Sequence, residues 1–100
     1  LRRANAFGYA VSPNKLFDYM AASRPVICAV PGATARLVVE HGAGLAVEPE
    51  DPAALAEAVR RLLDATEAER EAMGARGRQL VEREFSREVL AQRLVELVAG

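Results

Sequence analysis

The sequence predicts an α/β fold built around a parallel sheet, and two patterns point to it. Two short, largely apolar runs, residues 25–30 and 43–49, have the length and the bounding prolines and glycines of buried strands. Segments with helical signals precede, separate and follow these runs. Strands that alternate with helices indicate βαβ units, and therefore parallel strands with helices packed on the sheet.

The first helix has a clear start. Residues 1–11 show no regular pattern and are expected to be irregular. Ser12 is a favourable N-cap, and Pro13 suits the first helical position, where a missing N–H costs nothing. We expect this helix to end near Arg24, because the residue before a proline leaves the helical region. A strand over residues 25–30 follows.

A short helix and a second strand come next. The helix is expected over residues 34–42, and Gly42 suits the position just beyond a helix end. The second strand covers residues 43–49. Asp51 and Pro52 then cap and open a longer helix. Its apolar side chains form one face: Leu55, Ala58, Val59 and Leu62.

Two further helices are expected in the last third of the chain. Thr66 and Glu69 form a capping-box pattern, and Gly74 and Gly77 are expected to weaken the helix midway. Ser86 caps the last helix, whose apolar side chains recur at helical spacing: Leu90, Leu94 and Leu97.

Two strands cannot form a stable sheet alone, so we expect the missing strands to precede residue 1. The chain also begins without an initiator methionine and without a long apolar signal segment. We therefore expect residues 1–100 to be the C-terminal portion of a Rossmann-like domain in a larger protein, with short parallel strands followed by C-terminal helices.

Composition and charge argue against several classes of function. The chain is 51% hydrophobic and 27% charged, as folded domains are. A net charge of -1 offers no basic surface for nucleic acid, and no apolar run approaches the roughly 20 residues of a membrane span. Cys28 and His41 are the single cysteine and histidine. We expect Cys28 in the core and His41 at a helix end, and we expect no disulfide, thiol nucleophile or metal site.

The first helix carries the polar side chains that suggest chemistry. At about 100° per residue, one side holds Asn14, Lys15, Asp18, Tyr19 and Ala22. The apolar side is expected to face the sheet and holds Leu16, Phe17, Met20 and Ala21. Lys15 is the only lysine in the chain, and it lies in the first helical turn, which prefers anions to cations.

A phosphate would explain a lysine at this position. Backbone N–H groups at a helix start bind phosphates, and Ser12 and Lys15 add a hydroxyl and a positive charge. Asp18, about one turn further on, can accept hydrogen bonds from sugar hydroxyls, as the ribose-binding acid of dinucleotide folds does. The pattern favours a sugar nucleotide. Two plainer interpretations stay open, in which Ser12 is only a cap and Lys15 and Asp18 form a surface pair.

Three segments resemble the C-terminal part of GT-B glycosyltransferases of family 4, the group 1 type. They are SPNKLFDYMAASRPVI (12–27), EHGAGLAVEPEDPAALAEAVRRLL (40–63) and MGARGRQLVEREFS (73–86). The resemblance covers residues 8–98 and is nearest to bacterial enzymes of capsule, O-antigen and colanic-acid assembly. It implies two Rossmann-like domains that face each other across a cleft, the C-terminal one holding the nucleotide-sugar donor.

The resemblance also implies roles for the start of the first helix. Ser12, Asn14 and Lys15 would lie near the donor diphosphate, with Lys15 as the catalytic residue that stabilises the leaving group without a metal ion. Asp18 matches the second acid of the family's motif of two glutamates separated by seven residues, which binds the nucleotide ribose. The first acid of that motif would fall at position 10, where this chain has Ala10.

The implied reaction is the retaining transfer of a hexosyl group from a nucleotide sugar, expected to be UDP-linked, with no cofactor. The acceptor would be a glycan or a lipid-linked glycan in polysaccharide biosynthesis, in the cytoplasm or at the inner face of the membrane. The missing N-terminal domain would bind it, so we expect the isolated chain to be inactive, and its exposed C-terminal helices could pair in a dimer. Two alternatives remain, a non-catalytic nucleotide-binding or interaction module and a GT-B-like sugar-nucleotide epimerase.

Overall fold

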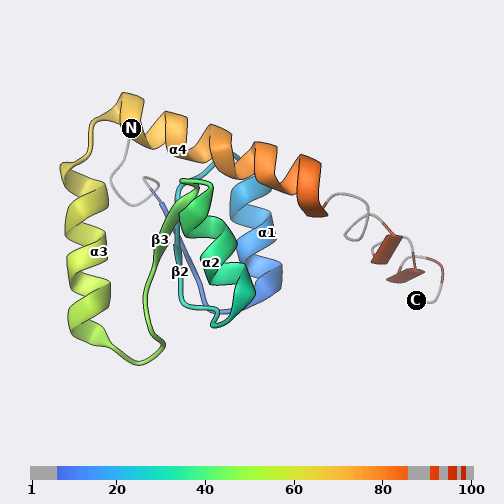
Figure 1. Cartoon of the computed structure of the whole chain (residues 1–100), viewed down its shortest axis with the longest axis horizontal. Helices are drawn as coiled ribbons and strands as arrows, with labels where there is room; N and C mark the ends of the chain where they lie inside the picture. Colours follow the sequence, from blue (N-terminus) through green and yellow to red (C-terminus); the bar gives the residue numbers. More distant parts are fainter. Residues whose placement is uncertain (1–6, 86–90, 93–94, 97, 99–100) are drawn as a thin grey trace.

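The computed structural model describes residues 7–85, 91–92, 95–96 and 98, and it confirms the predicted α/β fold (Figure 1). Its strands are β1 (Gly8–Ala10), β2 (Val26–Cys28) and β3 (Gly44–Ala46), which form a parallel sheet in the order β1-β2-β3. Its helices are α1 (Pro13–Ala21), α2 (Ala33–Glu40), α3 (Pro52–Asp64) and α4 (Glu67–Leu80), and the π-helical turn η2 (Val81–Phe85) follows α4.

Strand β1 overturns the expectation of irregular structure over residues 1–11. Gly8 and Ala10 pair with Val26 and Cys28 of β2, and the Gly8 N–H donates to the Pro25 carbonyl at 2.8 Å. A three-residue strand that begins with glycine is too short to show alternation, and its pairing depends on a distant segment. One strand that was expected before residue 1 therefore lies within the chain.

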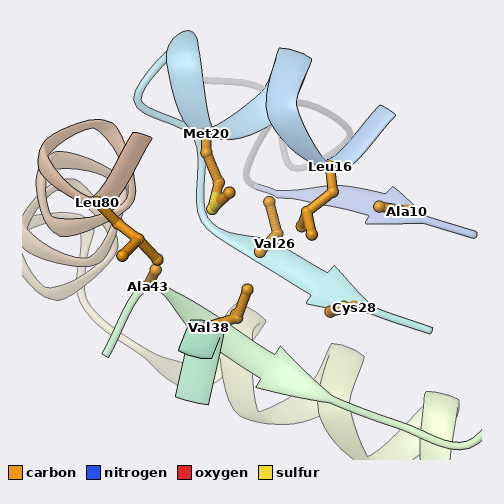
Figure 2. Packing of buried hydrophobic residues seen from close by; sticks show 8 residues of the cluster. All are labelled: Ala10, Leu16, Met20, Val26, Cys28, Val38, Ala43 and Leu80. Atoms are coloured by element: carbon orange, nitrogen blue, oxygen red, sulfur yellow. The ribbon is translucent and has the colours of Figure 1, made fainter. Parts of the chain in front are cut away.

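The central strand β2 is buried on both faces, as its continuous apolar sequence predicts. Val26 and Cys28 face one core cluster, into which α1 contributes Leu16 and Met20 (Figure 2). Ile27 alternates to the opposite face, where it packs with Ala58 and Leu62 of α3. The sheet therefore has α1 and α2 on one face and α3 on the other.

Helix α1 packs as predicted through Leu16 and Met20, which are fully buried. Two assignments of the helix faces are wrong. Ala21 is exposed, although it was expected to face the sheet. Tyr19, which was placed on the polar side, is partly buried and packs with its ring directly on Gly8. Gly8 has no side chain, and so it leaves room for this ring at the margin of the apolar face.

Helix α4 opens with the predicted capping box, formed by Thr66 and Glu69. Gly74 and Gly77 do not interrupt the helix, because α4 runs unbroken from Glu67 to Leu80. Both glycines are buried where the helix meets the rest of the fold. Close packing against α1 and its turn offsets their low helix propensity.

The four residues on which the prediction of a last helix rests lie outside the described part of the chain: Ser86, Leu90, Leu94 and Leu97. The pairing of this helix in a dimer stays a prediction. Within the described residues, no helix combines the length and the apolar character that crossing a membrane requires.

Candidate functional site

The three turns that follow the strands lie together at the carboxyl edge of the sheet, because the strands are parallel. In Figure 1 they lie along the lower edge of the molecule, and α4 crosses the opposite end. Helices α1, α2 and α3 all begin at this edge. Open α/β sheets bind ligands outside the carboxyl ends of their strands, so this edge is the candidate site.

The start of α1 has the predicted cap. Ser12 is the N-cap, and its side-chain oxygen accepts a hydrogen bond from the Lys15 backbone N–H at 3.4 Å. The Ser12 hydroxyl proton can still be donated to a ligand. Pro13 has no N–H, and the Asn14 N–H donates to no acceptor in the described part of the chain. The backbone N–H of Asn14 is therefore a donor that this helix start can offer to an anion.

Ser12, Asn14 and Lys15 lie at the start of α1, and Asp18, the fourth predicted site residue, lies near the middle of this helix. Asn14, Lys15 and Asp18 are exposed, and Ser12 is partly buried beneath them. Lys15 and Asp18 are three residues apart in a helix and so lie on the same side, one turn from each other. A positive charge near the cap and a carboxylate one turn further along suit a ligand with a phosphate and neighbouring hydroxyls.

The start of α2 is a second candidate that the sequence analysis did not assign to the site. It follows β2 directly, and β2 pairs with β1, so it lies beside the start of α1. Its N-cap is Gly32, with φ of 96°, and no described side chain caps the first turn. The Pro31-Gly32 pair between a buried strand and a helix was the available signal. The starts of α1 and α2 thus follow neighbouring strands at this part of the edge.

Acidic residues occupy the other part of the edge. Glu48, Glu50 and Asp51 are exposed in the turn between β3 and α3. The Asp51 carboxylate caps α3 by accepting from the Ala54 N–H at 3.0 Å. Since β3 is two strands from β1, these acids lie on the order of 10 Å from the α1 side. An anionic ligand is therefore favoured at the α1 and α2 starts and disfavoured at the α3 start.

Ala10 ends β1 but does not reach the surface. It is fully buried and belongs to the cluster that also contains Leu16 and Cys28 (Figure 2). An acid at position 10 would place its carboxylate in an apolar core without a partner, which is costly. Position 10 therefore contributes no charged group to the edge.

Cys28 and His41 take structural positions, as the sequence predicts. Burial raises the pKa of the Cys28 thiol, whose Sγ donates to the Val30 carbonyl at 3.6 Å, so Cys28 is poorly suited to act as a nucleophile. His41 is the C-cap residue of α2, and its Nδ1 lies 3.0 Å from the Leu37 carbonyl. Within the described ranges, no group of three or more His, Cys, Asp or Glu residues could hold a metal ion.

A depression of about 560 Å³ lies between α3 and α4, lined by residues that include Leu45, Arg61, Met73 and Arg76. It lies beside the end of α3, away from the edge at which α3 begins. Its charged rim mixes both signs, with Asp64 and Glu69 beside the two arginines. The carboxyl edge remains the better candidate, because the chain places its helix starts and its single lysine there.

Comparison with known proteins identifies the family. The family model of glycosyl transferases group 1 matches residues 3–65, which is more than half of the chain. The matched range contains all three strands and α1, α2 and α3, and therefore the whole carboxyl edge. No curated protein and no solved structure matches the chain. The chain belongs to the group 1 glycosyltransferase family.

Proposed function

We propose that this chain carries part of the donor site of a glycosyltransferase and binds the nucleotide diphosphate at the start of α1. Membership of the family implies sugar transfer from nucleotide sugars. One observation carries the proposal to particular residues. The Ser12-capped start of α1 presents the Asn14 amide and the exposed Lys15 at the carboxyl edge, beside the uncapped start of α2.

The chemistry of this arrangement suits a diphosphate leaving group. The diphosphate gains negative charge as the glycosidic bond breaks. A fixed amide and an ammonium stabilise that charge more in the transition state than in the ground state, and so they accelerate the bond cleavage. In this proposal Lys15 is the catalytic residue, Ser12 and Asn14 bind the diphosphate, and Asp18 accepts hydrogen bonds from the nucleotide ribose.

The rest of the proposed reaction follows from the family resemblance. The donor is UDP-linked, a hexosyl group is transferred with retention, and the acceptor is a glycan or a lipid-linked glycan of polysaccharide biosynthesis. A separate N-terminal domain binds the acceptor, so this chain alone binds the donor without turning it over. We place the reaction in the cytoplasm, at the inner face of the membrane when the acceptor is lipid-linked.

A calorimetric titration with UDP, GDP and dTDP tests the binding step. We expect one of the three to bind saturably to the wild-type chain and to lose most of its affinity in the Lys15→Ala variant. Arg60→Ala is the matched control, because Arg60 is an exposed cation on α3, paired with Glu57 at 2.8 Å. Equal loss in both variants would indicate a general charge effect and would reject the proposed site.

Ala10 supports a second candidate, a nucleotide-binding module without catalysis. The family motif places an acid at this position to contact the donor sugar, and here the position is buried and apolar. A module of this kind would bind a nucleotide and its sugar conjugate equally well. Comparing the affinities for UDP and UDP-hexose separates the two candidates, because a donor site gains affinity from the sugar.

A further inference from the structure

The end of α1 that lies away from the candidate site is held by Gly8, Tyr19 and Arg24. The Tyr19 ring packs on Gly8 of β1 so closely that a methyl group at position 8 would overlap it. Arg24, in the turn between α1 and β2, places its guanidinium carbon 5.0 Å from the centroid of the same ring. This distance is in the range of a cation–π contact.

Arg24 also joins α1 to the segment before β1. Its Nη2 donates to the Phe7 carbonyl at 2.7 Å, and its backbone N–H donates to the Tyr19 carbonyl at 2.9 Å. Its Nε is buried and has no acceptor in the described part of the chain. Burial of this donor is unfavourable. The guanidinium is thus held between β1 and α1 by the ring and by one strong hydrogen bond.

The position of Tyr19 couples this contact to Lys15. Tyr19 follows Lys15 by four residues in α1, so the two side chains lie on one side of the helix. Each residue turns an α-helix by about 100°. Fixing the Tyr19 ring against Gly8 and Arg24 therefore fixes the direction in which Lys15 projects from the same helix. The buried apolar anchors Leu16 and Met20 each follow one of these two residues and lie about 100° further round the helix.

Arg24 itself cannot touch a ligand at the site. Helix α1 has nine residues and is therefore about 13 Å long, and Arg24 lies beyond its last residue. The Ser12 cap lies at the other end. Any effect of Arg24 on a bound nucleotide has to pass through the orientation of α1.

We propose that Arg24, acting through Tyr19, is a positioning residue that sets the orientation of α1 and thereby aligns Lys15 with the donor diphosphate. This inference rests on the proposed function of Lys15. It predicts that removing the Arg24 guanidinium tilts or rotates α1 and weakens nucleotide binding while every residue at the helix start is kept.

Four forms of the 100-residue chain test this proposal: wild type, Arg24→Met, Arg24→Lys and Leu62→Ala. Arg24→Met keeps an unbranched side chain with an apolar stem but removes the guanidinium, and with it the charge and the hydrogen bond to Phe7. Arg24→Lys keeps a cation for the Tyr19 ring. Leu62→Ala is the control for lost stability, because Leu62 of α3 is buried and packs with Ile27 on the other face of the sheet.

Two quantities are measured well below the melting temperature of each variant. Residual dipolar couplings of the backbone amides report the orientation of α1 relative to the sheet. Calorimetry gives the dissociation constant of whichever of UDP, GDP and dTDP the wild type binds. We expect Arg24→Met to change the α1 couplings and to weaken binding by about tenfold or more, since small misplacements of binding groups have large effects. Arg24→Lys should give α1 couplings and an affinity between those of Arg24→Met and wild type. Leu62→Ala should change neither the α1 couplings nor the affinity.

Each other result overturns the proposal in an identifiable way. If Arg24→Met keeps the wild-type couplings, Arg24 does not orient α1, whatever happens to the affinity. If Arg24→Met and Leu62→Ala lose affinity equally, the effect is general destabilisation. If the wild type binds a nucleotide and Arg24→Met binds it equally well, the diphosphate site stands and the role of Arg24 falls. If the wild type binds none of the three, the proposed function fails first, and the role of Arg24 fails with it.

Discussion

Gly74 of α4 packs directly against the carbonyl oxygen of Ser23, so closely that a methyl group at position 74 would overlap that oxygen. Ser23 lies in the turn that ends α1 and has a left-handed φ of 60°. The contact therefore joins α4 to a turn with little freedom to move. Its partner is backbone, which cannot swing aside as a long side chain can.

We predict that Gly74→Ala destabilises the fold, although alanine is the better helix former. The gain in helix propensity is about 1 kcal/mol, and overpacking against a fixed atom costs about 1–3 kcal/mol. Urea unfolding followed by circular dichroism measures the difference. Gly77→Ala is the control, because the nearest atom to its new methyl group would be Met20 Cγ at 3.3 Å, in a flexible side chain. If Gly74→Ala and wild type have equal free energies of unfolding, a methyl group at position 74 does not clash with the Ser23 carbonyl oxygen as predicted.

The end of α3 depends on a side chain from α4. Arg70 Nη1 donates to the Leu62 carbonyl at 2.9 Å and also to the Ala65 carbonyl, both in the last turn and cap of α3. We predict that Arg70→Met lowers the free energy of unfolding by about 1–3 kcal/mol, because partly buried carbonyls lose their donor. Arg78→Met should have little effect, since Arg78 forms an exposed pair with Glu82. If the denaturant midpoints of Arg70→Met and Arg78→Met fall equally, the Arg70 hydrogen bonds do not specifically stabilise the end of α3.

The capping box of α4 makes stability depend on pH. The Thr66 backbone N–H donates to the Glu69 carboxylate at 2.8 Å and holds the pKa of Glu69 below its ordinary value. The pKa of Glu57 is lowered in the same direction by Arg60. A group whose folded pKa is depressed stabilises the fold above its unfolded pKa, and this contribution is lost as pH falls through the folded pKa. The chain should therefore lose stability on acidification below the ordinary glutamate range.

Glu69→Gln isolates the contribution of this one carboxylate. Glutamine keeps an acceptor for the Thr66 N–H but does not titrate. We expect its unfolding free energy to decline less than that of the wild type when the pH is lowered from about 7 to about 3. Glu71→Gln, on an exposed position of the same helix, controls for the changed net charge. If the unfolding free energies of Glu69→Gln and wild type fall in parallel as the pH is lowered, titration of Glu69 does not contribute to the pH dependence of stability.

The helices could be predicted from the sequence because their starts are local. Ser12, Asp51 and Thr66 each accept a backbone hydrogen bond as predicted, and a few adjacent residues specify each cap. Strand β2 was predictable for a similar reason, since a continuous apolar run indicates burial on both faces.

The features that the sequence did not indicate depend on distant partners. Strand β1 exists because Gly8 and Ala10 meet β2, and the packing of Tyr19 depends on the space above Gly8. In the candidate site, Lys15 could be located from its own helix. The position of Gly32 beside the start of α1 could not be predicted in this way, because it follows from the pairing of β1 with β2. Local sequence patterns indicate where each helix begins, whereas the order of the strands in the sheet determines which helix starts are neighbours.

Chemical-shift mapping of a nucleoside diphosphate on the chain tests the central proposal most directly. With UDP added to the isotope-labelled chain, we predict the largest changes at the amides of Asn14 and Lys15 and of Ala33 and Thr34, and small changes at Glu67 and Glu71 of α4. Uridine without phosphate should leave the Asn14 amide nearly unchanged. Shifts that gather instead around Arg61 and Met73, in the depression between α3 and α4, would contradict a diphosphate site at the start of α1.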